Sequence, residues 1–306
     1  MKEICINLKR FDIPKKFGGL CPIDQPKVWI EDIIKETAQL CNSYDKTLSI
    51  TYFLPESLII PASLAVKKYN AKISIGSQGV HWQDTESGGN FGAFTTSLPA
   101  SAALTSGASW ALIGHTEERN KFNYLLSYVE NSQDVAYQKR VKQAVNEILN
   151  AQVLRALEKG LDLLYCVGET AQEQGSGSDE EKIENLREVL TKQLTVGLKG
   201  VKEIIGQQKI VIGYEPIWSI GPGKKPASPE YVDKATQIIK EIGTQLEIED
   251  IKVIYGGGLK AANARELGAI EALDGGLVAL TQFTPPLGFL VKDLYEIMRM
   301  FLQENM

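Results

Sequence analysis

The sequence of 306 residues predicts an α/β protein built as a single (β/α)8 barrel. Eight short apolar runs alternate with segments of helical periodicity, which is typical of repeated β–α units with parallel strands. Polar residues and glycines collect directly after these runs, and the carboxyl ends of the strands form the active site in such a barrel. The competing fold, a doubly wound open sheet, would carry a G-x-G-x-x-G turn after the first strand, where this chain has Asn7-Leu-Lys9-Arg10-Phe11. One domain over residues 1–306 is therefore expected.

Each strand is predicted from a short apolar run with turn or polar residues after it. The eight runs are Glu3–Leu8, Thr47–Phe53, Lys72–Gly76, Trp110–Ile113, Leu161–Val167, Lys209–Tyr214, Lys252–Tyr255 and Gly276–Leu280. Helical spacing or start signals predict the helices between them. These are Val28–Asn42, Glu56–Lys68, Ala100–Thr105, Val141–Leu157, a helix capped by Ser178 or Asp179, a helix starting at Ser228-Pro229, and Leu287–Leu302.

The segment from Asn120 to Lys159 is longer than one crossover helix requires. Its second part, Val141–Leu157, carries the helical pattern, so Tyr124–Gln138 is predicted to be an inserted loop or helix. We therefore expect an insertion around residues 120–140. A long loop, His81–Thr96, is expected after the third strand because it contains three glycines.

The composition excludes several classes of function. A net charge of −5 and a pI near 5.4 argue against a nucleic-acid-binding surface, and the scattered basic residues argue against a polybasic membrane patch. No apolar run approaches the roughly 18 residues of a membrane span, and no signal peptide is expected at Met1. The four cysteines form no C-x-x-C pair, and two histidines do not suffice for a zinc cluster. A cytoplasmic, reduced protein without metal or cofactor is expected.

The stretch from Lys209 to Lys224 carries the clearest sign of chemistry. A buried strand ends in Glu215, and the proline behind it restricts this residue to an extended backbone. An apolar tip with Trp218 follows, and the glycines of Gly221-Pro-Gly223 leave the backbone free to approach a ligand or to move. The pattern predicts a catalytic base beneath a mobile lid. The alternative, a surface loop with a solvated Glu215, explains neither the tryptophan nor the glycines.

Two other strand ends offer polar groups. Asn7 and Lys9 follow the first strand two positions apart, which puts both side chains on one face. His115 follows the fourth strand at a predicted helix start, where the positive end of the helix dipole disfavours an imidazolium, so a neutral donor is expected. Taken alone, Lys9 could merely keep an edge strand soluble, and His115 could be a structural histidine. Their place on the same rim as Glu215 favours the catalytic interpretation.

Together these strand ends resemble the triose-phosphate isomerase family along nearly the whole chain. The matching stretches occur in the same order and on the corresponding strands. They are Asn7-x-Lys9, Gly92-Ala-Phe-Thr95, Gly114-His115-Thr-Glu117, Cys166-Val-Gly-Glu169, Tyr214-Glu-Pro-Ile-Trp218, Gly221-x-Gly223-Lys224, Tyr255-Gly-Gly257 and Asp274-Gly275. The resemblance implies a TIM barrel and an intramolecular aldose–ketose isomerase that needs no cofactor.

The resemblance also implies a role for each catalytic residue. Glu215 is the base, His115 the electrophile and Lys9 the cation, while Asn7 binds substrate oxygens and Glu117 orders the lysine. The chemistry agrees, since isomerising an α-hydroxy carbonyl needs a carboxylate base, a donor to the oxygens and a cation near the developing charge. This family is itself the reference case for a neutral histidine beside a glutamate base under a closing loop. The assignment is therefore carried over from the family and not worked out independently.

The phosphate end of the implied substrate site departs from the family. The resemblance assigns Gly221, Gly258, Ala279 and Leu280 to substrate binding. The family has serine at the position of Gly258 and Gly-Gly at Ala279-Leu280. The backbone N–H groups remain, but the added side chains narrow or reshape the pocket. Glyceraldehyde 3-phosphate and dihydroxyacetone phosphate are expected as substrates, and a four-carbon tetrulose phosphate is the alternative.

The implied assembly is a homodimer with a changed interface. In the family, the loop ending in Thr95 reaches into the partner's site, and its Gly-Glu pairs with an arginine after the fourth strand. Here Thr96-Ser97 and Glu118 occupy those positions, but loss of an exposed pair removes only about 0–1 kcal/mol. The loop keeps its apolar residues, so we expect a homodimer, to which Tyr124–Gln138 adds contacts.

Two other classes of function stay open at this stage. A divergent paralogue could bind a sugar phosphate as a sensor without turnover, although retention of Lys9, His115 and Glu215 argues against it. A barrel aldolase would need a Schiff-base lysine in mid-strand, and none of the predicted strands carries one. No nucleic-acid or membrane partner is expected.

Overall fold

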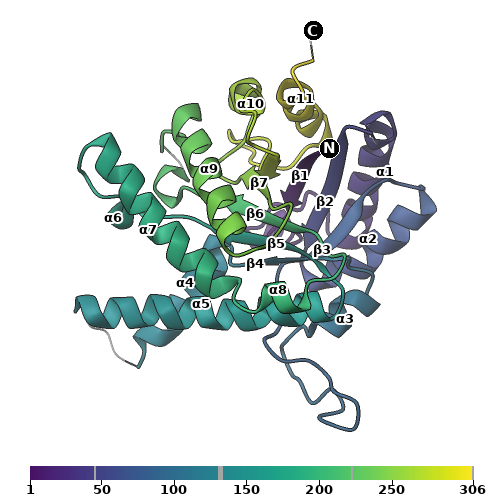
Figure 1. Cartoon of the computed structure of the whole chain (residues 1–306). Coiled ribbons are helices and arrows are strands. Elements are labelled where there is room, and N and C mark those ends of the chain that lie inside the picture. The colour runs from purple at the N-terminus through teal and green to yellow at the C-terminus, as the bar shows by residue number, and fades with distance from the viewer. Residues whose placement is uncertain (45, 130–133, 222, 305–306) are drawn as a thin grey trace.

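The computed structural model describes residues 1–44, 46–129, 134–221 and 223–304, in which eight parallel strands close into a barrel surrounded by helices (Figure 1). The strands are β1 (Lys2–Asn7), β2 (Leu48–Leu54), β3 (Ser74–Ser77), β4 (Trp110–Ile113), β5 (Asp162–Val167), β6 (Ile210–Tyr214), β7 (Lys252–Tyr255) and β8 (Gly275–Val278). Each strand pairs with its neighbours in chain order, and pairing of β1 with β8 closes the sheet. The predicted barrel is confirmed.

Helices on the outside of the barrel connect successive strands (Figure 1). They are α1 (Pro26–Tyr44), α2 (Glu56–Lys68), α3 (Ala100–Thr105), α4 (Thr116–Ser127), α5 (Val135–Glu158), α6 (Ala171–Gln174), α7 (Asp179–Gly197), α8 (Val201–Ile204), α9 (Pro229–Gln245), α10 (Ala261–Gly268) and α11 (Val291–Phe301). The predicted caps are present, since Ser178 accepts from the N–H of Glu181 and Ser228 from that of Tyr231. Asp179 is the first residue of α7 and not its cap.

The core has two layers because side chains alternate along each strand. On β1, Cys5 belongs to the cluster inside the barrel, whereas Ile4 and Ile6 belong to the larger cluster between strands and helices. The inner cluster comprises Cys5, Phe53, Trp110, Leu112, Leu164, Cys166, Val211, Ile254 and Leu277. Strands buried on both faces read as nearly continuous apolar runs, which is why the sequence predicts them well.

The chain after β8 differs from the prediction. The strand ends at Val278 and not at Leu280, because the N–H groups of Thr281 and Gln282 both turn to the carbonyl of Gly288 at 3.1 Å. This short antiparallel hairpin leaves Ala279 and Leu280 outside the sheet. The closing helix therefore begins at Val291, four residues later than expected.

Most other elements shift by a residue or two, and two segments differ further. The third strand covers Ser74–Ser77 and not Lys72–Gly76, because its pairing with β2 starts only at Ser74. The predicted insert Tyr124–Gln138 contains the end of α4 and the beginning of α5, and residues 130–133 lie outside the described part of the chain. An insertion relative to other barrels stays a prediction.

Candidate active site

Three of the predicted catalytic side chains lie at the carboxyl ends of β1, β4 and β6. Parallel strands all end on one side of a barrel, so residues distant in sequence meet there. Nε2 of His115 lies 3.1 Å from Oε1 of Glu215. Nζ of Lys9 lies 2.7 Å from Oε1 of Glu117, whose other oxygen is 3.8 Å from Nδ1 of His115. Glu117 is thus paired with Lys9 and lies near His115.

Lys9 has a strained backbone that two amides hold in place. Its φ of 43° lies in the left-handed region, which costs a non-glycine residue roughly 1–2 kcal/mol. The N–H of Lys9 donates to Oδ1 of Asn7 at 2.9 Å. Nε2 of Gln78 donates to the carbonyl of Lys9 at 2.9 Å and to Oδ1 of Asn7 at 3.1 Å. Because these bonds occupy the amide oxygen of Asn7, its amide nitrogen is the group left to donate to a ligand.

Gln78 was missed by sequence reasoning. It follows β3 directly, at the rim where the other polar residues gather, and that position was the available signal. Its contacts with the first strand could not be deduced, since they depend on how β1 and β3 lie on either side of β2.

The ring of His115 is oriented by the start of α4. It is the N-cap of that helix, and its Nδ1 accepts from the N–H of Glu117 at 3.3 Å. A ring nitrogen that accepts a hydrogen bond carries no proton, so the hydrogen of the neutral ring is on Nε2 and points at Glu215. With 8% of its surface exposed, His115 is shielded from water.

Glu215 is anchored on the first turn of α4. Its Oε2 accepts the N–H of Thr116 at 3.0 Å and the hydroxyl of Thr116 at 3.1 Å, and the residue is 4% exposed. Thr116 is a second residue that sequence reasoning missed, although it lies between His115 and Glu117. A Cβ on Gly256 would lie 3.0 Å from Cγ of Glu215, so the end of β7 packs closely behind the base.

The loop after Glu215, termed the lid, is tied to a buried carboxyl group. Nε1 of Trp218 donates to Oε1 of Glu169 at 2.6 Å, and the hydroxyls of Tyr214 and Tyr231 donate to the same oxygen at 3.0 and 3.1 Å. Burial raises the pKa of Glu169 to about 7, although the three donors favour the ionised form. The first turn of the lid thus rests on a group that titrates near neutral pH. Sequence reasoning quoted Glu169 as part of a motif but gave it no role.

The residues expected at the phosphate end lie in the loops after β6, β7 and β8. Gly221 and Gly258 have φ of 121° and 91°, which favours glycine at both positions. Within the described residues, the N–H groups of Gly258, Ala279 and Leu280 donate to no protein acceptor, whereas that of Thr281 is taken by the hairpin. Free backbone donors at one rim suit an anion. Pro222, in the middle of the predicted glycine hinge, lies outside the described residues.

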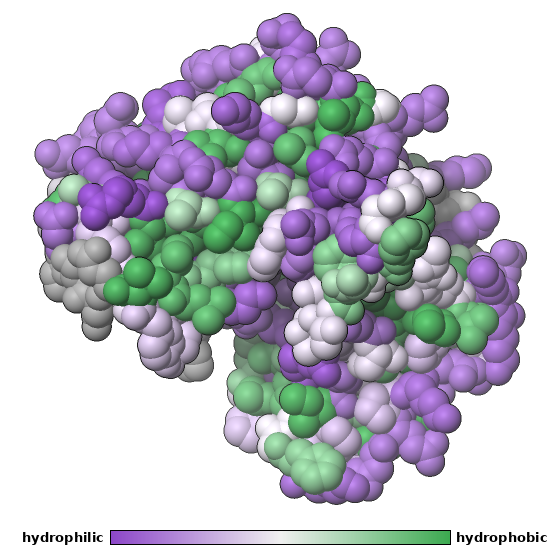
Figure 2. Space-filling model, turned by 90° about the horizontal axis from the view of Figure 1, so that it is seen from below, coloured by the Kyte–Doolittle hydropathy of each residue, from purple (hydrophilic) through white to green (hydrophobic). Residues whose placement is uncertain are grey.

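Thr95 lies apart from this site in the same chain. It is exposed on the loop between β3 and α3, which protrudes from the barrel (Figure 1), and the described residues show no contact between it and the catalytic side chains. A groove of about 450 Å³ runs beside the base of this loop. Its lining includes Gln78, Trp82, Ser97, Glu118 and Leu125. The face seen from below shows apolar patches and a hollow beside a protruding lobe (Figure 2).

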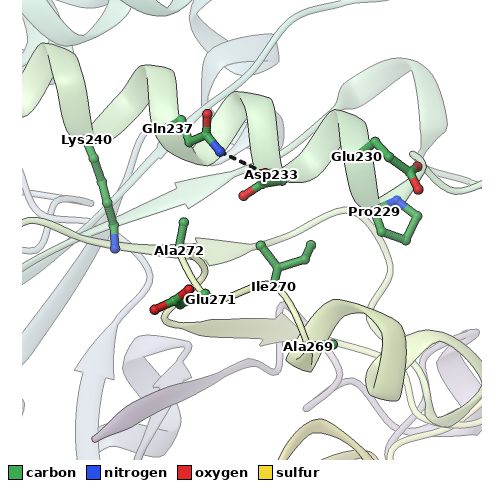
Figure 3. A pocket seen from close by; sticks show the side chains of 9 residues that line it. All are labelled: Pro229, Glu230, Asp233, Gln237, Lys240, Ala269, Ile270, Glu271 and Ala272. Carbon is green, nitrogen blue, oxygen red and sulfur yellow. Dashed lines mark hydrogen bonds between the residues drawn. The ribbon is translucent and has the colours of Figure 1, made fainter.

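A larger groove of about 660 Å³ lies on the outside of the barrel, away from the catalytic residues. It runs between α9 and the turn from α10 to β8, as Figure 3 shows. Glu230, Asp233 and Glu271 give it an acidic character, while Lys240 is paired with Asp274 at 2.8 Å. None of its lining residues was predicted to have a catalytic role, so the barrel rim is the candidate active site.

Two kinds of feature are absent from the residues that the structure describes. No cluster of three or more histidine, cysteine, aspartate or glutamate residues has the arrangement of a metal site. Among the helices of that same part of the chain, none combines the length and the apolar character of a membrane span.

Comparisons with known proteins agree on one family. The family model described as triosephosphate isomerase matches residues 27–287. Triosephosphate isomerase of Alkaliphilus metalliredigens is 33% identical over 211 residues, 68% of this chain and 71% of the relative. That of Parasynechococcus marenigrum is 30% identical over 224 residues, 73% and 75% of the two chains. The crystal structure of triosephosphate isomerase from Bartonella henselae has a TM-score of 0.64 over 98% of both chains but 21% identity, so this likeness shows the fold alone.

Proposed function

Because the chain belongs to the triosephosphate isomerase family, we propose that it is an intramolecular aldose–ketose isomerase that interconverts glyceraldehyde 3-phosphate and dihydroxyacetone phosphate. The observation that carries the proposal is the contact of 3.1 Å between Nε2 of His115 and Oε1 of Glu215. A carboxylate and a neutral imidazole side by side provide the base and the donor that transfer of a proton between adjacent carbons requires. No cofactor is needed.

The reaction proceeds through an enediolate. Glu215 removes the proton from the carbon next to the carbonyl, and the electron pair moves onto the carbonyl oxygen. Nε2–H of His115 donates to that oxygen, and the ammonium of Lys9 stabilises the developing negative charge. The protonated Glu215 then returns a proton to the neighbouring carbon, while His115 passes the hydroxyl proton from one enediolate oxygen to the other. The reaction therefore needs no external oxidant or reductant.

Two movements precede the chemistry. Glu215 exchanges its bonds to Thr116 for a position beside the substrate carbon, since both oxygens are occupied in the ligand-free site. The lid then folds over the substrate and excludes water, which strengthens the charge interactions inside. Trp218 and Glu169 hold the fixed end of the lid during this movement.

The phosphate end supports a second candidate within the same chemistry. Backbone donors for the phosphate come from Gly221, Gly258, Ala279 and Leu280. The side chain of Leu280 is half-buried, and the hairpin follows it directly. A site reshaped there favours a ligand of different length, such as a tetrulose phosphate. A non-catalytic sugar-phosphate-binding paralogue is the remaining alternative, and the paired base and donor argue against it.

We further propose a cytoplasmic homodimer, with one domain per chain and an insertion around residues 120–140. The loop that carries Thr95 extends from the barrel, and Phe91 on it is 87% exposed. Tyr124, Leu125, Tyr128 and Val129 on and after α4 are also exposed. Apolar side chains of this kind stabilise interfaces between subunits by leaving water.

A turnover assay with a panel of three- to five-carbon aldose and ketose phosphates tests the proposal. Conversion of glyceraldehyde 3-phosphate with the highest kcat/KM of the panel is the expected result. Preference for a four-carbon substrate would transfer the assignment to the second candidate. Binding of several substrates without turnover of any would contradict an enzymatic function.

A further inference from the structure

Glu118, at the start of α4, turns inward to the residue before His115. Its Oε2 accepts the N–H of Gly114 at 2.8 Å. The sequence assigned Glu118 to an ion pair lost from the subunit interface, and the structure gives the side chain a partner within its own chain. The carboxylate of Glu118 is therefore hydrogen-bonded to the backbone that connects β4 to α4.

The backbone of Gly114 is fixed on both sides. While Glu118 holds its N–H, Nε of Arg119 donates to its carbonyl at 2.8 Å. Gly114 has a φ of 79°, and a Cβ there would lie 2.9 Å from the carbonyl oxygen of Cys166. Arg119 is buried and bonded in turn to Oδ1 of Asn146 at 2.8 Å. Two consecutive side chains of α4 thus determine the peptide groups that enter His115.

The buried side-chain amide of Gln152 lies near Glu118. Gln152 of α5 is 4% exposed and lines the same groove as Glu118. Its Oε1 has no hydrogen-bond partner among the described residues. Burial raises the pKa of Glu118 above its ordinary value. The other carboxylate of the turn, Glu117, is paired with Lys9.

The direction of the imidazole depends on this turn. His115 is the N-cap, and its Nδ1 is oriented by the N–H of Glu117 at 3.3 Å, while Nε2 must point to the reacting oxygen. The N–H and the carbonyl of Gly114 belong to the two peptide groups that precede His115. If these groups rotate, the Cα–Cβ bond of His115 changes direction and Nε2 is displaced. Misplacement of a catalytic group by about 1 Å can reduce a rate roughly 100-fold.

We propose that Glu118, supported by Gln152, is a positioning residue that fixes the Gly114 peptide and thereby aims Nε2 of His115. The part of this inference that concerns turnover rests on the proposed isomerase function. The part that concerns the orientation of His115 does not, and it is measurable in a protein without activity.

The test compares Glu118→Met with Glu118→Gln. Methionine fills a similar volume but offers no strong acceptor, whereas the amide oxygen of glutamine still accepts from Gly114. For Glu118→Met we expect kcat to fall at least about tenfold, with KM unchanged within about twofold, because positioning acts on the transition state. Glu118→Gln should retain kcat within about twofold. Equal losses in both variants, or wild-type kcat in Glu118→Met, would overturn the proposal.

A spectroscopic measurement separates positioning from loss of stability. The chain has only two histidines, so ¹⁵N NMR of the imidazole rings resolves His115 with His81 as an internal reference. Glu118→Met should shift or broaden the His115 signals and leave those of His81 unchanged. Gln152→Met serves as the second variant if Glu118→Met fails to fold, with the same expected shift. Unchanged His115 signals in either folded variant would refute the positioning role, whatever the activity.

Thr37→Val provides the matched control. The hydroxyl of Thr37 is buried and bonded to the carbonyl of Ile33 and to the hydroxyl of Tyr52, each at 2.7 Å. Its replacement removes a buried hydrogen bond between α1 and β2, far from α4. We expect this variant to lose stability while kcat and the His115 signals stay at wild-type values. A loss of kcat equal to that of Glu118→Met would assign the effect to general destabilisation and overturn the proposal.

Discussion

Replacement of Glu169 by glutamine should change how the stability of the protein depends on pH. Burial raises the pKa of Glu169 from its ordinary value of 4.5 to about 7 in the folded chain. Between these two values the folded state binds more protons than the unfolded state, so the free energy of unfolding falls as pH rises. The difference of about 2.5 corresponds to roughly 3 kcal/mol, since one pKa unit is about 1.4 kcal/mol.

Urea unfolding of the wild type and of Glu169→Gln between pH 4.5 and 8 measures this effect. Glutamine does not titrate, and all other groups are shared, so the difference between the two proteins isolates Glu169. The wild type should lose about 3 kcal/mol relative to the variant over this range, with little further change above pH 8. A difference that is constant within about 0.5 kcal/mol would refute the reasoning.

Glu173→Gln is the control with the opposite sign. Burial opposes the ionisation of Glu173, but hydrogen bonds from Lys142 and Thr170 outweigh it and lower the pKa. The stability that Glu173 contributes is present above pH 4.5 and is lost only as the pH falls through the lowered pKa. The difference between wild type and Glu173→Gln should therefore be nearly constant between pH 4.5 and 8.

Three further predictions follow from the contacts at the rim. Gln78→Leu should lower kcat about tenfold or more in steady-state kinetics, because Asn7 and Lys9 lose the amide that orders them; an unchanged kcat would contradict this. Lys9→Met should be inactive and Lys9→Arg should keep at most a trace of activity, since a guanidinium differs in shape from an ammonium, and full turnover by Lys9→Met would exclude the proposed cation. Sedimentation at micromolar concentration should show a dimer, and a fully active monomer would contradict the proposed interface.

The barrel and the polar residues at its rim could be predicted because both leave local signals. Strands buried on two faces produce apolar runs, and the polar residue that follows each run marks the rim, as with Glu215 after β6. The helix start at His115 was likewise readable from the residues that follow it. The strands, the rim residues and this helix start are all determined by residues close together in the sequence.

The features that the sequence did not predict depend on contacts between distant segments. Glu169 meets Tyr231 across 62 positions, and Gln78 meets Lys9 across 69, so neither role has a sequence signal of its own. The inward turn of Glu118 places its carboxylate on the N–H of Gly114, a contact that the side chain's polarity does not reveal. The early end of β8 arises from a hairpin closed by Gly288, ten residues after Val278, which an apolar run cannot reveal.

The central claim, that the carboxylate of Glu215 transfers a proton between adjacent carbons, is tested most directly by NMR of the isomerisation in D₂O. Wild-type enzyme acting on glyceraldehyde 3-phosphate should form dihydroxyacetone phosphate and place solvent deuterium on the carbon that receives the proton, because the carboxyl proton exchanges with solvent. Glu215→Gln should stay folded and lose this exchange and the turnover together, by roughly 10³-fold or more for the missing base. Deuterium incorporation at the wild-type rate in Glu215→Gln would contradict the mechanism. Turnover by the wild type that places no solvent deuterium on that carbon would contradict it as well.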